Sequence, residues 1–320
     1  MPRSREDFSP YRALRILAEG GTATVHEAVQ IQTGERVALK VLHTDLSNDP
    51  EWCARLLNEA RLAGRIQHPG VLKVCSIGES SARRPYLVLE LLRGQTLAQR
   101  LAAAQPHTRS ALREALELGA QAADILVAAH AAGIVHRDLT PSNLFLEGAS
   151  ANRVPRVRLL DLGLARELAE APADLEPEAP WSGFGSIGYV APEQIRDPAT
   201  AGERADVYSL GAILFEVLAG CRPFACEREQ DELYAQLSGS PLPLSALAPS
   251  APPRLIALIV QMLSRAQSSR PDMSTVRAEL LVMKATLQIA RTALPPFPTG
   301  AHTGRCDEAY TGVHFSMVSD

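Results

Sequence analysis

The hydrophobic periodicity of this 320-residue chain changes once, near Gly94, and that change limits the folds open to it. Before Gly94, apolar and β-branched residues alternate with polar residues in short runs, which is typical of strands. After Gly94, apolar residues recur at helical spacing. A β-rich front followed by a helical back indicates an α+β fold of two lobes, and 320 residues are enough to give each lobe its own core.

The expected elements follow from these patterns and from the turn residues between them. One helix, at 51–66, interrupts the strands and ends at the His-Pro-Gly of 68–70. Residues 206–219 are apolar on nearly all sides, which predicts a fully buried helix that ends at Gly220. The strands are expected at 11–17, 25–30, 36–42, 71–79 and 86–90, and the further helices at 109–132, 227–237, 253–263 and 273–289.

These elements predict one domain over residues 11–285, with an N lobe at about 11–91 and a C lobe at about 92–285. Residues 1–10 are expected to form a short extension. The stretch 167–180 is acidic, contains proline and lacks periodicity, so a mobile loop is expected there. Pro, Gly and Thr predominate near the end, which predicts a disordered tail over 290–320.

Charge and cysteine content argue against several classes of function. The net charge is −4, so the chain lacks the basic excess with which proteins neutralise nucleic-acid phosphates. The five cysteines form no CxxC pair and are odd in number, which argues against a zinc site or a disulfide framework. No apolar run approaches the roughly 20 residues that span a bilayer, and the charged start lacks a signal peptide's apolar core. We expect a cytoplasmic protein with reduced thiols and no membrane span.

The strongest motif is His-Arg-Asp-Leu-Thr-Pro-Ser-Asn at 136–143, which resembles the catalytic loop of protein kinases. The resemblance covers about residues 11–285, and its details are most similar to bacterial serine/threonine kinases. A single short fragment would be weak support, but several in the family's order are specific. The others are Val-Ala-Leu-Lys at 37–40, Glu59, Asp-Leu-Gly at 161–163, Ala-Pro-Glu at 191–193, Asp-Val-Tyr-Ser-Leu-Gly at 206–211 and Arg-Pro at 270–271.

The resemblance implies a two-lobed protein-kinase-like fold and transfer of the γ-phosphate of ATP to Ser/Thr hydroxyls of protein substrates. Lys40 would place a cation on the α/β-phosphates, and Glu59 would hold its flexible stem. Lysine is scarce in this chain, which argues against an incidental surface lysine at position 40. Asn143 and Asp161 would supply the oxygen ligands that suit Mg²⁺, and Asp138 would accept the proton of the substrate hydroxyl.

The family resemblance also implies where the nucleotide docks. Backbone groups of the linker Glu90, Leu91 and Leu92 are expected to bind the base, with Leu89 at the back of the pocket. The same residue types would also serve plain core packing, and the sequence does not separate the two roles. Apolar walls are expected from Leu17, Val25, Ala38 and Leu146 or its neighbour Leu144.

The phosphate-covering loop departs from the family pattern G-x-G-x-x-G. Ala18, Gly20 and Ala23 stand at the three glycine positions, with Gly21 beside the middle one. Each alanine adds a Cβ where the backbone would approach phosphates, and it restricts φ. We therefore expect a looser grip on the nucleotide rather than none, because the glycine pair Gly20-Gly21 remains at the tip of the loop. A simple hairpin turn at these two glycines fits the sequence equally well.

Thr140 stands where serine/threonine kinases usually carry a lysine that reaches the γ-phosphate. Its hydroxyl can form a hydrogen bond with phosphate but carries no charge, so a reduced rate is expected rather than inactivity. Leu162 replaces the phenylalanine of the metal-binding motif and can fill the same apolar slot. Ser186 matches the position that faces the catalytic aspartate in Ser/Thr-specific members.

Three charged residues are expected to have structural roles. Glu193 and Arg270 would form a buried pair that ties the activation segment to the C lobe. Asp206 would brace the catalytic loop from the buried helix.

Arg137 precedes the catalytic aspartate, and in the family such an arginine pairs with a phosphorylated residue of the activation loop. Between Gly163 and Ser186 the only hydroxyl is that of Ser182, which makes it a candidate for autophosphorylation. We hypothesise that phosphorylated Ser182 or a nearby carboxylate neutralises Arg137; a solvated acidic loop fits equally well. The carboxylates are Glu167, Glu170, Asp174, Glu176 and Glu178.

Two other functions stay open. Ala18, Ala23 and Thr140 favour a pseudokinase or a weakly active signalling scaffold, whereas the complete set of catalytic residues opposes it. A small-molecule phosphotransferase with a related loop is the other alternative. The Ala-Pro-Glu segment and the helix at 227–237 favour a protein substrate instead.

Overall fold

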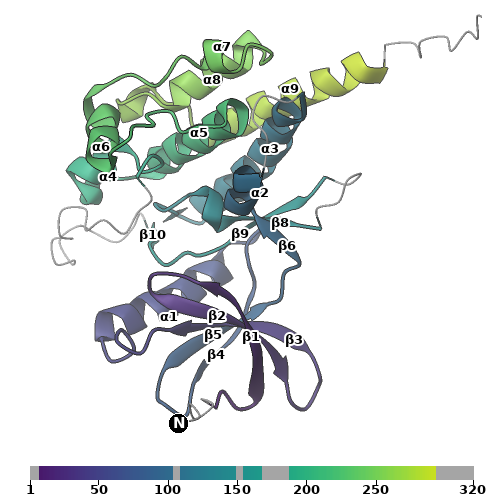
Figure 1. The fold of residues 1–320 in the computed structure, drawn as a ribbon, viewed down its shortest axis with the longest axis vertical. Coiled ribbons are helices and arrows are strands. Elements are labelled where there is room, and N and C mark those ends of the chain that lie inside the picture. The colour runs from purple at the N-terminus through teal and green to yellow at the C-terminus, as the bar shows by residue number, and fades with distance from the viewer. Residues whose placement is uncertain (1–6, 104–108, 149–153, 168–186, 293–320) are drawn as a thin grey trace, which may run out of the picture.

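The computed structural model describes residues 7–103, 109–148, 154–167 and 187–292, and it has the two lobes that the sequence predicts (Figure 1). The N lobe is a five-stranded antiparallel sheet in the order β1-β2-β3-β5-β4, and helix α1 (Pro50–Arg65) contacts β4 and β5. The strands are β1 (Tyr11–Glu19), β2 (Ala23–Gln30), β3 (Arg36–Leu42), β4 (Val74–Glu79) and β5 (Pro85–Glu90).

Strand alternation gives the sheet two apolar faces. In β3, Ala38 and Lys40 share one face and Leu39 points to the other, because successive side chains alternate. Leu39 packs in an outer cluster with Phe8, and Ala38 packs in an inner cluster with Leu56 of α1. The inner face therefore directs Lys40 toward α1.

Helix α1 begins where the sequence predicts. The Asp49 side chain caps it by accepting a hydrogen bond from Glu51 N at 2.9 Å, and Pro50 occupies the first turn. Its buried residues are Leu56, Glu59 and Leu62. The helix therefore carries an acidic side chain on its buried face, which needs a partner.

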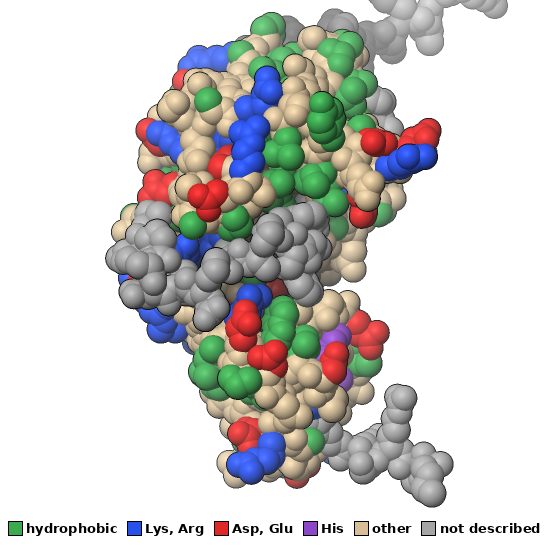
Figure 2. All heavy atoms as spheres, turned by 90° about the vertical axis from the view of Figure 1, so that its left-hand side faces the viewer, with side chains coloured by type: hydrophobic (Ala, Val, Ile, Leu, Met, Phe, Trp, Pro, Cys, Tyr) green, Lys and Arg blue, Asp and Glu red, His purple; other side chains and the backbone are tan. Residues whose placement is uncertain are grey.

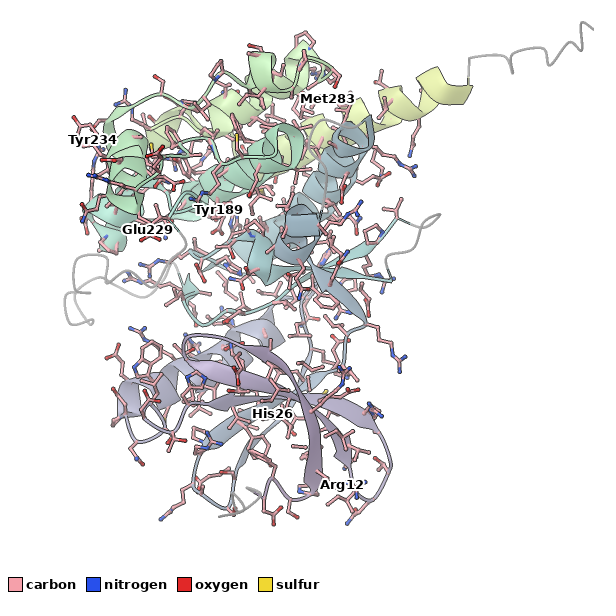
Figure 3. The ribbon with its side chains drawn as sticks, in the orientation of Figure 1. Arg12, His26, Tyr189, Glu229, Tyr234 and Met283 are labelled. Atoms are coloured by element: carbon pink, nitrogen blue, oxygen red, sulfur yellow. The ribbon has the colours of Figure 1, made fainter. Side chains whose placement is uncertain are left out.

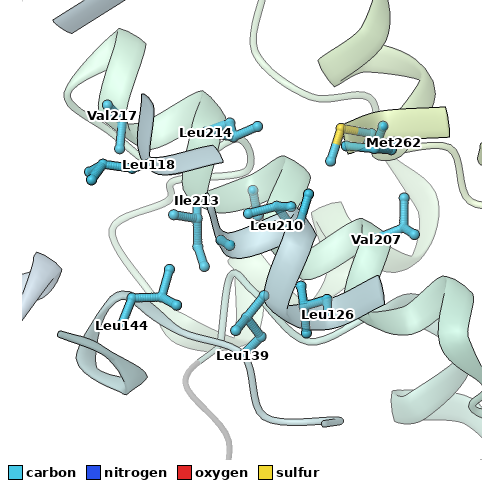
Figure 4. Close-up of a cluster of buried hydrophobic side chains, with 14 of the residues drawn as sticks. Leu118, Leu126, Leu139, Leu144, Val207, Leu210, Ile213, Leu214, Val217 and Met262 are labelled. Carbon is cyan, nitrogen blue, oxygen red and sulfur yellow. The ribbon is translucent and has the colours of Figure 1, made fainter. Parts of the chain in front are cut away.

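The C lobe is built around α5 (Glu203–Ala219), which is buried along nearly its whole length. Gly220 ends it at φ 75°, where its N–H donates to Glu216 O at 2.8 Å. Figure 4 shows side chains of this core, including Leu210 and Ile213 of α5 beside Leu139 and Leu144. This rigid core lies directly under the loop that follows residue 135.

The remaining elements surround this core. The second sheet has the order β6-β8-β9, and β7 pairs with β10. These strands are β6 (Gly94–Thr96), β7 (Ile134–Val135), β8 (Leu144–Glu147), β9 (Arg156–Leu159) and β10 (Arg166–Glu167). The other helices are α2 (Leu97–Ala103), α3 (Arg109–Ala131), α4 (Pro192–Arg196), α6 (Glu229–Ser238), α7 (Leu244–Leu247), α8 (Pro253–Met262) and α9 (Met273–Thr292), with short 3₁₀ turns η1 (Pro141–Asn143), η3 (Pro198–Thr200) and η4 (Gln267–Ser269).

Several boundaries differ from the sequence prediction. The strand expected from residue 71 begins at Val74, because Val71 instead bridges to Leu159 of the C lobe. Glu167, the first residue of the expected mobile loop, lies instead in β10 and pairs with Ile134. Residues 168–180 of that expected loop and the tail beyond 292 lie outside the described ranges.

The start of the described chain packs against the N lobe. The ring of Phe8 is buried and lies edge-on to Tyr86, with 5.5 Å between centroids. His26, labelled on the sheet in Figure 3, is also near Phe8. Phe8 therefore adds to the outer cluster and anchors the start of the described chain to the N lobe.

The surface mixes charges of both signs. Figure 2 shows acidic and basic side chains interspersed on one face of the molecule, in keeping with the small net charge of −4. Over the described ranges, no helix has the length and apolar character needed to span a membrane.

Candidate active site

Three charged side chains meet between the lobes. Lys40 Nζ lies 2.7 Å from Glu59 Oε2 and 3.0 Å from Asp161 Oδ2. Strand β3 supplies the lysine, α1 supplies the glutamate, and the segment after β9 supplies the aspartate. The fold thus brings together three residues that the sequence analysis assigned to one site.

Their electrostatics keep the ammonium charged. Burial by itself lowers the pKa of Lys40, but the charges of Glu59 and Asp161 outweigh it and raise that pKa. Burial, with the charge of Asp161, raises the pKa of Glu59 to about 7. Burial also acts to raise the pKa of Asp161, yet Lys40 and the Gly163 N–H hold it below its usual value. A cation and an ionised Asp161 are therefore available at this point.

Asp138 and Asn143 form the second part of the site. Asn143 Nδ2 donates to Asp138 O at 2.8 Å and to Asp138 Oδ2 at 3.2 Å, so the amide fixes the carboxylate. Burial raises the pKa of Asp138 to about 6, and the charge of Asp161 adds to the rise while His136 opposes it. A carboxylate with such a pKa can take up a proton near neutral pH.

The loop that carries Asp138 is held from the C-lobe core. Asp206 of α5 is fully buried and accepts hydrogen bonds from His136 N at 3.0 Å and Arg137 N at 2.9 Å. The Nε2 of His130 lies 2.7 Å from the same carboxylate. This confirms the expected bracing, and it stabilises Arg137 at φ 66°, which a non-glycine residue rarely adopts.

The oxygen atoms at the site suit a hard divalent cation. Because Asn143 uses its amide nitrogen toward Asp138, its carbonyl oxygen can act as a ligand, and Asp161 contributes a carboxylate. No group of three or more His, Cys, Asp or Glu side chains in the described ranges could hold a metal alone. This small donor set fits Mg²⁺, which usually binds one or two protein oxygens and completes its shell with water and phosphate.

The linker between the lobes has an ionic anchor that the sequence analysis missed. The Glu90 side chain accepts from Lys73 N at 2.7 Å and pairs with Arg158 of β9. Arg158 is itself buried, and it also donates to Glu147 Oε2 at 3.1 Å and Val71 O at 3.2 Å. An arginine between Val157 and Leu159 was the available signal, since buried charges need partners.

The predicted pocket walls divide between two places. Ala38, Val25 and Leu89 lie together in or against the inner cluster of the N lobe, and Leu17 on β1 is partly exposed. Leu91 also packs against that inner cluster, whereas Leu92, next in the linker, is half-buried.

The prediction for the pocket floor needs correction. Leu146 and Leu144 both point into the C-lobe core, where each is buried. Strand alternation in β8 places Phe145 on the opposite face, where it is only half-buried. Phe145 is therefore the apolar residue of β8 that remains accessible to a ligand.

The loop expected to cover the phosphates is a hairpin, and the alanines at its two ends differ in burial. Gly20 N donates to Ala23 O at 2.9 Å, and a Cβ on Gly21 would meet no atom within 4 Å. Ala18 is exposed on β1, but Ala23 is buried in the inner cluster. The interpretation of Ala23 as a methyl in the path of phosphates was therefore wrong: its side chain packs in the lobe.

Thr140 is also less accessible than expected. Its exposed fraction is 3%, and its carbonyl oxygen accepts from Asn143 N at 3.0 Å to form the turn η1. A phosphate can meet its hydroxyl only if neighbouring groups move. The fold uses Thr140 to shape the turn that presents Asn143.

The segment after residue 187 is anchored as predicted. Glu193 and Arg270 form a buried bidentate pair with N–O distances of 2.6 and 2.8 Å. Tyr189, seen against α5 in Figure 3, donates to Glu216 Oε2 at 2.5 Å. Leu162 is buried in the C-lobe core, consistent with its expected apolar slot.

The regulatory residues are only partly described. The candidates Ser182, Ser186, Glu170, Asp174, Glu176 and Glu178 lie outside the described ranges. Glu167 is described, and it forms ion pairs with Arg61 and Arg65 of α1. Arg137 donates from Nη2 to Pro198 O at 3.1 Å.

Sequence comparisons with known proteins identify the family to which these residues point. A family model for the protein kinase domain matches residues 11–281. The serine/threonine-protein kinase PknA of Mycobacterium tuberculosis (strain ATCC 25177 / H37Ra) is 36% identical over 253 residues, 78% of this chain and 55% of that protein. The serine/threonine-protein kinase pkn2 of Myxococcus xanthus is 35% identical over 296 residues, 92% and 34% respectively. PknB of Mycolicibacterium smegmatis (strain ATCC 700084 / mc(2)155), also a serine/threonine-protein kinase, is 33% identical over 277 residues, which are 85% of this chain and 42% of that protein. The chain thus spans about half, or less, of each relative's length.

Proposed function

The chain belongs to the protein kinase family, and from this premise we propose that it transfers the γ-phosphate of ATP to serine or threonine hydroxyls of protein substrates. The observation that best supports the proposal is the meeting of Lys40, Glu59 and Asp161 next to Asp138 and Asn143. A scaffold would not need this complete set. The names of the bacterial relatives support the choice of serine and threonine as acceptors.

In the proposed reaction, each residue has a separate task. Lys40, held by Glu59, binds the α/β-phosphates as a point charge. Asp161 and the amide oxygen of Asn143 would hold Mg²⁺, which would neutralise the phosphate charge when bound. Asp138 orients the substrate hydroxyl and receives its proton. The hydroxyl oxygen bonds to the γ-phosphorus while the bond from that phosphorus to the β,γ-bridging oxygen breaks, and ADP leaves.

The base and ribose of ATP would dock at the linker. The backbone of Glu90–Leu92 offers hydrogen-bonding groups, although Glu90 N already donates to Lys73 O at 3.1 Å. Its carbonyl oxygen and the backbone of Leu92 are therefore the groups we assign to the base. Val25 and Ala38 would cover one side of the base, and Phe145 would replace Leu146 on the other.

Three finer points belong to the same proposal. We place the protein in the cytoplasm, with proteins as its partners. Its small net charge, with both signs interspersed on the face in Figure 2, argues against nucleic acid as a partner. Ser182 is the proposed autophosphorylation site, being the sole hydroxyl between Gly163 and Ser186. Ser186 is assigned to substrate recognition on the family pattern.

A weakly active or inactive scaffold is the second candidate. Burial of Thr140 favours it, because neither a charge nor an exposed hydroxyl then stands at the position of the family's phosphate-binding lysine. Ala23 no longer favours it, since its methyl packs in the N lobe.

The deciding experiment measures phosphate incorporation from radiolabelled ATP with Mg²⁺ into generic protein acceptors. Wild type is compared with Asp138→Asn, which keeps the size of the side chain but removes the proton acceptor. We expect incorporation by wild type and a loss of at least about 100-fold in the variant. Equal incorporation by both proteins, or none by wild type, would exclude the catalytic proposal. Small alcohols and aminoglycosides as acceptors test the remaining alternative.

A further inference from the structure

One carboxylate joins α1 to the segment that follows the metal-binding motif. Glu167 in β10 pairs through Oε1 with Arg61 Nη1 and through Oε2 with Arg65 Nη1. The two arginines are four residues apart, so they lie on one face of the helix. The Glu167 side chain is only 14% exposed, and the two guanidinium groups hold its pKa below the usual value.

The two ends of this contact reach both halves of the active site. On α1, Glu59 lies close in sequence to Arg61 but on a different face, and it holds Lys40 at 2.7 Å. On the other side, β10 pairs with β7 through Glu167–Ile134 and Arg166–Val135. The chain runs directly from Val135 into the loop of Asp138. Glu167 therefore contacts the helix that holds Lys40 and also lies in the strand that pairs with the start of the catalytic loop.

We propose that Glu167 is a positioning residue that holds α1 where Glu59 meets Lys40, and that it does so without a phosphate on the activation segment. This inference rests on the proposed kinase function. In this chain a built-in carboxylate supplies the negative charge that orders α1 against the segment.

The charges of Arg61 and Arg65 explain why replacing Glu167 with a neutral residue should weaken the contact with α1. Without Glu167, Arg61 and Arg65 would be like charges on adjacent turns of one helix face, which is unfavourable. Arg65 also donates from Nη2 to Ala132 O at 3.3 Å, just beyond α3, so the contact has a second support in the C lobe. Arg61 and Arg65 are partly exposed, hence salt should weaken the contact.

The test compares Glu167→Gln with a matched control, Glu51→Gln. Glu51 forms an ion pair with Arg55 at 2.5 Å on the same helix but touches no other element through it. Both variants are made in a Ser182→Ala background, so that no phosphate at position 182 contributes. We expect Glu167→Gln to lower kcat about fivefold with an unchanged KM for the protein substrate, and Glu51→Gln to stay within about twofold. The loss should be smaller when wild type and variant are compared at high salt.

Charge exchange gives the sharper control. The triple variant Glu167→Arg, Arg61→Glu, Arg65→Glu rebuilds the contact with reversed signs and should recover most of the lost kcat. Equal kcat in Glu167→Gln and Glu51→Gln, or no recovery in the triple variant, would overturn the inference. An inactive Ser182→Ala protein beside an active wild type would also overturn it.

A second measurement separates this inference from the proposed function. Amide hydrogen exchange of residues 56–62 reports the ordering of α1 whether or not phosphate is transferred. We expect faster exchange there in Glu167→Gln than in Glu51→Gln. If wild type transfers no phosphate but this difference appears, the kinase proposal fails and the positioning role stands. If wild type is active and the exchange rates are equal, the positioning role fails alone.

Discussion

The buried pair of Glu193 and Arg270 allows a stability prediction that can be worked out from the structure. Arg270 has no exposed side-chain surface, and each of its five N–H groups has an acceptor. Two donate to the Glu193 carboxylate at 2.6 and 2.8 Å. The others reach the carbonyl oxygens of Ser264, Arg204 and Arg265 at 2.7, 2.9 and 3.2 Å.

Glu193→Gln keeps the shape of the side chain but removes its charge. One guanidinium N–H would then face an amide NH₂, and the buried cation would lose its counter-charge. Breaking a buried pair in this way costs about 3 kcal/mol or more of unfolding free energy. At roughly 2–4 °C per kcal/mol, the Tm should fall by about 6–12 °C.

Thermal and urea unfolding, followed by circular dichroism, measure this change. The matched control is Glu279→Gln, because Arg254 and Glu279 form a bidentate pair of similar length, 2.7 and 2.8 Å, at the surface. Their side chains are 59% and 31% exposed, so solvent screens the pair and the Tm should change by less than about 2 °C. If the two variants show the same shift, burial is not the source of the stability.

The remaining predictions concern the active site and the linker. Asp138 has a pKa of about 6 and must be ionised to accept a proton. We therefore expect kcat/KM to be constant above about pH 6 and to fall about tenfold per pH unit below it. A fall that begins only near pH 4 would contradict this. Arg158→Met leaves Glu90 and Glu147 without their shared cation and should lower the unfolding free energy by about 2 kcal/mol in urea, whereas Arg158→Lys should lose less; equal losses would argue against a charge effect.

Local periodicity was enough for the N-lobe strands and the longer helices, but it did not predict the short elements β6–β10, α2, α4 and α7. The central catalytic residues followed from the family resemblance. The family resemblance identified Lys40 and Glu59, and the alternation of side chains in β3 explains why Lys40 lies on the inner face, where it meets Glu59 of α1. The buried helix and its end at Gly220 followed from uniform apolar character. The pairing of Glu193 with Arg270 followed only from the family resemblance, since 77 positions separate the two residues.

The missed residues are those whose role depends on which strand face or which distant neighbour they meet. Ala23 could have been assigned to the inner face by extending the alternation of β2 back from Val25 by two residues. Phe145 could have been assigned to the accessible face by applying the same alternation to β8. For Arg158 the sequence signals only that a buried charge needs a partner, and for Glu167 it gives no local signal; their partners Glu90, Arg61 and Arg65 lie far away in the sequence.

Asp206 has a consequence for how heat inactivates the protein. Its carboxylate belongs to the most deeply buried helix, yet it fixes the main chain of the loop that carries Asp138. If the loop lost its shape while α5 stayed packed, the Asp206 carboxylate would lose two backbone donors in an apolar interior and keep only His130 as a partner, which is costly. Warming should therefore leave the catalytic geometry intact until the larger lobe melts as a whole, and earlier losses of activity would originate in the smaller lobe.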